Sequence, residues 1–272
     1  MVRTTAALIL FASLTLAQTA RTAQLEAALK ADPANRPARA ELVDYYYRTG
    51  SANPAVAIPA RRSHILWLIQ NAPADPLAGG PSATIDASGH ALADPTGFQQ
   101  ASTAWKTQIA RRDLPAQALA NAAYFFKLSD KGITFNTLER AVALEPANKE
   151  ICGRLGDAYA LAIMGITMIN KNGFPQGVDP AQTQSIFANQ ARIALGTSTN
   201  PYVLAKAGYM LSFQGSILRG TGQLAFDTAP LAEAALQRAV SLAPNDREVA
   251  EYLTQHRELQ RAVQQAKARP SR

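Results

Sequence analysis

The sequence has few residues that bind metals or form disulfides. It contains one cysteine, Cys152, and three histidines, His64, His90 and His256. A single cysteine excludes an intramolecular disulfide framework and any metal site built from several cysteines. The histidines are too far apart in the sequence for the close ligand pairs typical of zinc sites. We therefore predict no metal and no cofactor.

The sequence also lacks the common catalytic motifs. It has no G-x-S-x-G, no H-E-x-x-H and no G-x-x-x-x-G-K, and the pair Gly220-x-Gly222 stands alone. We expect Cys152 to be a buried, inert thiol, His64 to be solvated and His256 to be partly packed. These absences predict a protein that is not an enzyme.

Charged residues make up only 17% of the chain and aromatic residues 7%, but the net charge is +7. The basic clusters are short pairs, such as Arg61-Arg62 and Arg111-Arg112, with no aromatic residues between them to stack on bases. We therefore expect no nucleic-acid partner. Weak binding to polyanions remains an alternative.

The first residues have the pattern of a secretory signal peptide. Arg3 precedes an apolar run from Ala6 to Leu16, and small residues stand before Gln18. We predict a signal peptide over residues 1–17 and an exported protein, periplasmic or secreted. An uncleaved first helix is the alternative. No later apolar run is long enough to predict a transmembrane segment.

The rest of the chain has the spacing of an all-α protein. Alanine contributes 54 residues, which favours helices and close helix packing. Apolar residues recur every three or four positions, and no strand alternation competes with this pattern. The predicted helices cover residues 20–31, 37–49, 55–71, 96–111, 115–128, 132–144, 148–168, 180–195, 201–214, 229–242 and 246–266.

Three segments of the chain, residues 25–35, 138–148 and 236–246, align without a gap. Each has an apolar residue, an alanine three positions later, a proline five positions further, and then Asn or Asp. They resemble the closing half of a tetratricopeptide repeat, whose period is about 34 residues.

The opening half of that repeat, W-x-x-L-G-x-x-Y, resembles Cys152-x-x-Leu155-Gly156-x-x-Tyr159. Looser copies without the tryptophan are Arg39-x-x-Leu42-Val43-x-x-Tyr46, Leu119-x-x-Ala122-Ala123-x-x-Phe126 and Leu204-x-x-Ala207-Gly208-x-x-Leu211. The small residue of this pattern lies where two helices cross closely. A generic alanine-rich bundle is the alternative.

The resemblance implies one α-solenoid domain of helix hairpins over residues 18–272. The aligned copies begin at Leu25, Leu138 and Leu236, and their intervals of 113 and 98 residues are not multiples of 34. We therefore predict inserted loops near residues 71–95, 167–179 and 216–230, either functional or mobile. An enzyme or enzyme accessory domain with its site in these loops is the rival hypothesis.

The resemblance also implies a concave groove that binds a peptide or protein segment, and hence an interaction scaffold in the cell envelope. The chaperone-type carboxylate clamp is absent, so we do not expect an acidic C-terminal tail as ligand. The implied groove residues are Glu41, Asp44, Tyr47, Arg48, Asn121, Tyr124, Lys127, Arg154, Asp157, Lys206, Tyr209 and Phe213.

The last predicted helix has a polar face and no following partner. Its apolar residues include Val249 and Leu253, and its polar residues include Glu251, Gln255 and Arg261. A solenoid needs a terminal cap with a polar outer face. We predict a capping helix and a monomer; a dimerisation helix is the alternative.

Overall fold

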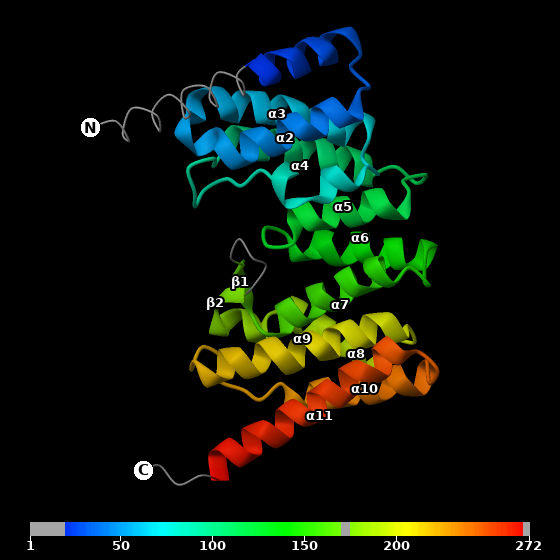
Figure 1. The fold of residues 1–272 in the computed structure, drawn as a ribbon. Helices are drawn as coiled ribbons and strands as arrows, with labels where there is room; N and C mark the ends of the chain where they lie inside the picture. The colour runs from blue at the N-terminus through cyan, green and yellow to red at the C-terminus, as the bar shows by residue number, and fades with distance from the viewer. Residues whose placement is uncertain (1–19, 170–174, 269–272) are drawn as a thin grey trace, which may run out of the picture. The chain divides into compact units, whose positions relative to one another are not determined.

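The computed structural model describes residues 20–169 and 175–268 of the chain. The described chain is mostly α-helical, as predicted (Figure 1). It divides into two compact units between Arg112 and Asp113. The predicted signal peptide, residues 1–17, lies outside the described residues.

Unit 1 consists of helices and three short 3-10 turns in its described residues. Helix α2 packs on α3, and α3 packs on α4. Asn35 caps the start of α2 and Asp94 caps the start of α4, and each helix begins with a proline in its first turn. The elements are helical residues 20–31, α2 (Arg36–Thr49), η1 (Gly50–Ala52), α3 (Pro54–Asn71), η2 (Pro76–Gly79), η3 (Pro81–Ala83) and α4 (Pro95–Ile109).

The first predicted insertion is tied to α3 by two arginines. Arg61 is 4% exposed, and it donates to the backbone carbonyl oxygens of Ser82, at 3.0 Å, and Thr84. Arg62 forms two hydrogen bonds of 2.6 Å with the carboxylate of Asp94. Bidentate ion pairs such as Arg62–Asp94 are strong and geometrically specific. The two arginines thus hold the middle and the C-terminal end of this segment against the helix.

Unit 2 consists of seven helices and a short hairpin in its described residues. Helix α5 packs on α6, α6 on α7, α7 on α8 and α9, α9 on α10, and α11 on both α9 and α10. The elements are α5 (Ala116–Phe126), α6 (Lys131–Leu144), α7 (Lys149–Ile163), β1 (Ile166–Ile169), β2 (Pro175–Val178), η4 (Pro180–Gln184), α8 (Ile186–Thr197), α9 (Pro201–Gly220), α10 (Ala229–Leu242) and α11 (Arg247–Ala268).

The segment after α7 differs from its prediction. The helix predicted over 148–168 ends at Ile163, and β1 then pairs antiparallel with β2. Gly165 has φ +67°, and a Cβ there would lie 2.6 Å from the backbone oxygen of Asp179. The chain therefore turns at this glycine. The last part of the predicted helix is therefore wrong, and the sequence did not show the strands because four residues are too few for an alternating pattern.

Two other helix boundaries also differ. The helix predicted over 180–195 begins at Ile186, because the Ser185 side chain caps the Ala188 N–H and the preceding residues form η4. Helix α9 continues to Gly220, six residues beyond its predicted end. The third predicted insertion therefore starts at Thr221 rather than at residue 216.

The three aligned segments make the same cap in the structure. In each, the Asn or Asp after the proline accepts a hydrogen bond from the backbone N–H three residues later, and so starts the next helix. The pairs are Asn35 with Ala38 at 3.0 Å, Asn148 with Ile151 at 3.2 Å and Asp246 with Val249 at 3.3 Å.

Two further contacts recur in the first two segments. The hydroxyl of Tyr46 donates to Glu26 at 3.1 Å, and the hydroxyl of Tyr159 donates to Glu139 at 2.7 Å. The side chains of Arg39 and Cys152 both bond to the backbone oxygen of the preceding segment's proline, at 2.7 and 3.4 Å. Aligned positions thus make the same tertiary contacts in unit 1 and in unit 2.

Candidate functional site

Unit 2 contains a cavity of about 280 Å³ between α5 and α7, which we call the α5–α7 pocket. Helix α6 contributes to its lining, and β1 and α9 each add one residue. Four predicted groove residues line it, Tyr124, Lys127, Arg154 and Asp157. Its apolar lining includes Ala123, Leu138, Ala158, Leu161, Ile169 and Met210.

Helical spacing brings the polar residues of the pocket together. Tyr124 and Lys127 are three residues apart at the end of α5, and Arg154 and Asp157 are three residues apart on α7. Residues at this spacing lie on one face of a helix. The Lys127 ammonium lies 3.6 Å from the centre of the Tyr124 ring, a cation–π contact.

Asp157 has an unusual environment. Its side chain is 35% exposed, but Oδ1 is shielded from solvent and accepts no hydrogen bond. The nearest ion-pair partner, Lys206 Nζ on α9, lies 3.9 Å from Oδ1. Burial raises the pKa of Asp157 to about 6, although Lys206 and Lys127 act against this.

The three predicted groove residues of α9, Lys206, Tyr209 and Phe213, lie between Asp157 of α7 and α11. Lys206 lies 5.6 Å from the centre of the Tyr209 ring. Tyr209 stacks on Phe213 with ring centroids 6.0 Å apart, and it contacts Tyr252 of α11 at 4.8 Å. Phe213 is 40% exposed. Tyr252 was not among the predicted residues, because its spacing on the last helix indicated only packing.

Asn121 differs from these side chains in being fully buried. Its Oδ1 accepts a hydrogen bond from Gln117 at 2.8 Å. Its side chain therefore helps to hold α5 together and does not face solvent.

The four predicted groove residues of unit 1 all lie on α2 and pair with neighbouring side chains. Glu41 accepts two hydrogen bonds from Arg21, at 2.9 and 2.8 Å. Arg48 pairs with Asp44 one turn away. The guanidinium of Arg61 lies 5.4 Å from the centre of the Tyr47 ring.

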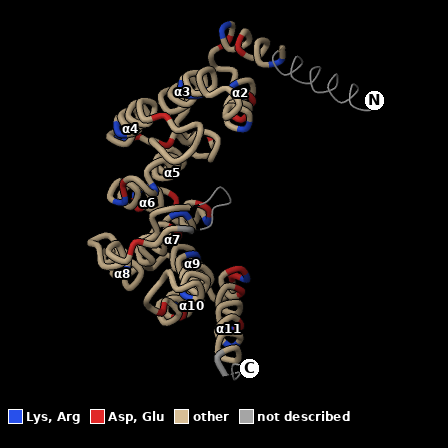
Figure 2. The backbone as a smooth tube through the Cα atoms, turned by 90° about the vertical axis from the view of Figure 1, so that its left-hand side faces the viewer, with Lys and Arg blue, Asp and Glu red and all other residues tan. Residues whose placement is uncertain are grey.

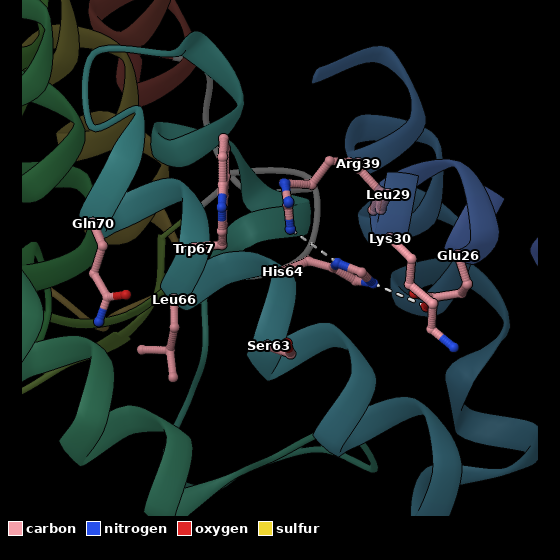
Figure 3. A pocket seen from close by; sticks show the side chains of 9 residues that line it. All are labelled: Glu26, Leu29, Lys30, Arg39, Ser63, His64, Leu66, Trp67 and Gln70. Carbon is pink, nitrogen blue, oxygen red and sulfur yellow. Dashed lines mark hydrogen bonds and ion pairs between the residues drawn. The ribbon is translucent and has the colours of Figure 1, made fainter. Parts of the chain in front are cut away.

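Unit 1 has a cavity of about 460 Å³ that none of these four residues lines. Figure 3 shows Arg39 beside Trp67, with His64 next to them. The Arg39 guanidinium lies 3.8 Å from the Trp67 ring centre. The sequence did not predict this cavity, although Arg39 stands where the repeat usually has tryptophan.

His64 links two charged residues at this cavity. Its Nδ1 lies 3.2 Å from Arg39 Nη1, and its Nε2 lies 3.1 Å from Glu26 Oε1. The prediction that His64 is solvated is wrong, since the residue is 5% exposed. Burial lowers the pKa of His64, because the charged imidazolium loses its hydration, although Glu26 acts against this shift.

A serine, a histidine and a glutamate meet in the helices of unit 2. His256 Nδ1 lies 2.7 Å from Ser212 Oγ, and its Nε2 lies 3.2 Å from Glu233 Oε2. The catalytic triads of some hydrolases contain the same three groups, but Ser212 and His256 are only 3% and 4% exposed. The serine hydroxyl therefore offers no surface to a substrate, and the three residues join α9, α10 and α11.

The polar residues of the predicted insertions form local pairs. Within unit 1, His90 Nε2 lies 2.8 Å from Asp86 Oδ2. Within unit 2, Asp227 pairs with Arg219 at 2.5 Å, and Asn172 lies outside the described residues. No cluster of three or more His, Cys, Asp or Glu suited to a metal ion occurs in the part of the chain that the structure describes.

Comparison of the chain with protein-family models, curated proteins and solved structures finds no match. Among the described residues, no helix is both long enough and apolar enough to span a membrane.

Proposed function

We propose that this chain is an exported, non-enzymatic scaffold of tetratricopeptide-like repeats that binds a peptide or protein segment in a groove of unit 2. The groove includes the α5–α7 pocket and the aromatic residues Tyr209 and Phe213 of α9. The observation that carries the proposal is that four predicted groove residues line this pocket. Three more lie on α9: Lys206 is 3.9 Å from Asp157, and Tyr209 stacks on Phe213.

The recurring contacts support the repeat part of the proposal. The same helix cap occurs three times, and the same Tyr–Glu hydrogen bond occurs twice, at aligned positions. The helices of unit 2 then pair as α5 with α6, α7 with α8 and α9 with α10. In this arrangement α11 is the terminal cap.

The state of Asp157 supports the binding part of the proposal. A shielded carboxylate oxygen without a hydrogen bond is costly, and such oxygens are few in folded proteins. On α9, Phe213 and Ile217 add apolar side chains that are 40% and 45% exposed. A bound segment would cover these side chains.

The experiment compares two variants in a pulldown from the envelope fraction. Phe213→Ser removes an exposed apolar side chain from the groove, and Ile193→Ser removes one that is 68% exposed on α8. We expect the wild type and Ile193→Ser to retain the same partner and Phe213→Ser to lose it. Equal retention by all three, or by none, would refute the groove.

Export is tested separately on the full chain expressed with its first residues intact. Intact mass measurement of the protein recovered from outside the cytoplasm should give a chain that begins at Gln18. A full-length chain that remains in the cytoplasm would contradict this part of the proposal.

A further inference from the structure

The α5–α7 pocket combines an apolar interior with a charged mouth. Ala123, Leu161 and Met210 line the interior, and Ile169 of the hairpin closes one side. A cavity of about 280 Å³ is near the small end of ligand sites. It has room for one bulky apolar side chain, and not for a helix or a strand.

The charges at the mouth are mainly positive. Lys127, directly after α5, and Arg154 of α7 line the pocket, and Lys206 of α9 lies 3.9 Å from Asp157. The negative charges at the mouth are Asp157 and Glu150, and Glu150 pairs with Arg154 at 2.8 Å. An acidic ligand is attracted to this mouth, and a basic ligand is repelled.

Resting on the function proposed above, we propose that the pocket recognises an internal peptide segment in which a bulky apolar side chain is flanked by acidic residues. The apolar side chain enters among Leu161 and Met210. A neighbouring carboxylate then pairs with Lys127 or Lys206, and the peptide continues along the Tyr209–Phe213 stack.

Asp157 makes this recognition sensitive to pH. The charged or titratable groups near it are Lys127 on α5, Arg154 on its own helix, Lys206 on α9 and Tyr252 on α11. As the pH falls through about 6, Asp157 gains a proton, and its repulsion of an acidic ligand disappears. The acidic peptide should therefore bind more tightly at about pH 5.5 than at about pH 7.5.

The test is fluorescence anisotropy with three short labelled Gly/Ser peptides, which carry a central Glu-Phe-Glu, Glu-Ala-Glu or Lys-Phe-Lys. We expect Glu-Phe-Glu to bind the wild type about tenfold more tightly than the other two. Tighter binding of Lys-Phe-Lys, or equal binding of the Phe and Ala peptides, would overturn the inference.

Variants of matched charge locate the effect. Lys127→Glu should weaken Glu-Phe-Glu binding about tenfold, whereas Lys106→Glu, on an exposed position of α4 in unit 1, should leave it unchanged. Ala158→Phe should fill the pocket and abolish the preference for Phe. Asp157→Asn should remove the pH dependence, and circular dichroism checks that each variant is folded.

The outcomes separate this inference from the proposed function. If no peptide binds while partner capture still depends on Phe213, the ligand class is wrong and the scaffold function stands. If capture does not depend on Phe213, the proposed function itself fails. Equal weakening by Lys127→Glu and Lys106→Glu would show attraction to overall charge and would also overturn the inference.

Discussion

The shielded carboxylate of Asp157 destabilises the folded state at neutral pH. Because its pKa is raised from 3.8 to about 6, the folded protein binds more protons than the unfolded chain between about pH 4 and pH 6. Its contribution to stability is therefore lost as the pH rises through this range. The shift corresponds to about 3 kcal/mol, and the partial exposure of the side chain reduces this to about 1 kcal/mol.

Asp157→Asn should therefore raise the free energy of unfolding at pH 7 by about 1 kcal/mol. Urea denaturation of the variant and the wild type at several pH values measures the difference. The gain should disappear below about pH 4, where the aspartate is protonated in both states. A variant that is less stable at pH 7 would contradict this account of the pocket.

His64 has the opposite dependence on pH. Its pKa is lowered from 6.5 by burial, so the unfolded chain binds more protons than the folded protein below about pH 6.5. The stability that the neutral imidazole provides is complete above this pH and is lost as the pH falls towards the lowered pKa.

His64→Gln should lose about 1–2 kcal/mol at pH 7.5, because Arg39 and Glu26 lose a hydrogen-bonding partner. Its stability should then fall less than that of the wild type between about pH 7 and pH 5.5. His256, whose pKa is also lowered by burial, remains in both proteins, so the comparison isolates His64. Parallel stability curves would show that His64 does not titrate as described.

At the scale of elements, two glycines of α7 have different surroundings. A Cβ on Gly156 would lie 2.5 Å from the backbone oxygen of Val203 and 2.8 Å from the backbone nitrogen of Ala207, both on α9. A Cβ on Gly153 would meet only the side chain of Lys206, at 3.6 Å. The close crossing of α7 and α9 therefore requires glycine at Gly156 alone.

Gly156→Ala should destabilise the protein by about 1–3 kcal/mol, because backbone atoms of α9 must move away. Gly153→Ala should be neutral or stabilise it by about 0.5–1 kcal/mol through its helix propensity. Thermal unfolding of the two variants compares the same substitution in the same helix. Equal effects would show that the crossing is not close at Gly156.

At the scale of the whole chain, α11 ends the helical arrangement of unit 2. Its predicted polar residues, Glu251, Gln255, Arg257, Glu258, Arg261 and Gln264, are all exposed, and Figure 2 shows acidic and basic residues along the helix. Val249 and His256, on its other face, are 1% and 4% exposed. The helix thus presents polar side chains outward and covers apolar surface of α9 and α10.

Deletion of residues 247–272 should lower the melting temperature and cause aggregation, because the apolar surface that α11 covers becomes exposed. Size-exclusion chromatography with light scattering should show a monomer before deletion. A dimeric wild type that becomes a stable, soluble monomer would support the dimerisation helix instead. An equally stable monomer after deletion would contradict both roles.

Part of the site could be predicted from the sequence. Tyr124 and Lys127, like Arg154 and Asp157, share a helix face because they are three residues apart. The raised pKa of Asp157 could not be predicted, since it depends on burial and on Lys206, which lies on another helix. The network of Glu26, Arg39 and His64 was missed for the same reason.

The sequence by itself determined most of the helices and the aligned segments of the chain, each with an Asn or Asp at the start of the next helix. Helical periodicity, an N-cap and a proline act over a few neighbouring residues, so a short window contains the whole signal. The tertiary structure decided the short hairpin, the pocket between α5 and α7 and the protonation of its acid. The strands of the hairpin are four residues each, too short to show an alternating pattern in the sequence. The pocket and its acid depend on residues far apart in the chain, whose burial and charge act on one another only after the helices have packed.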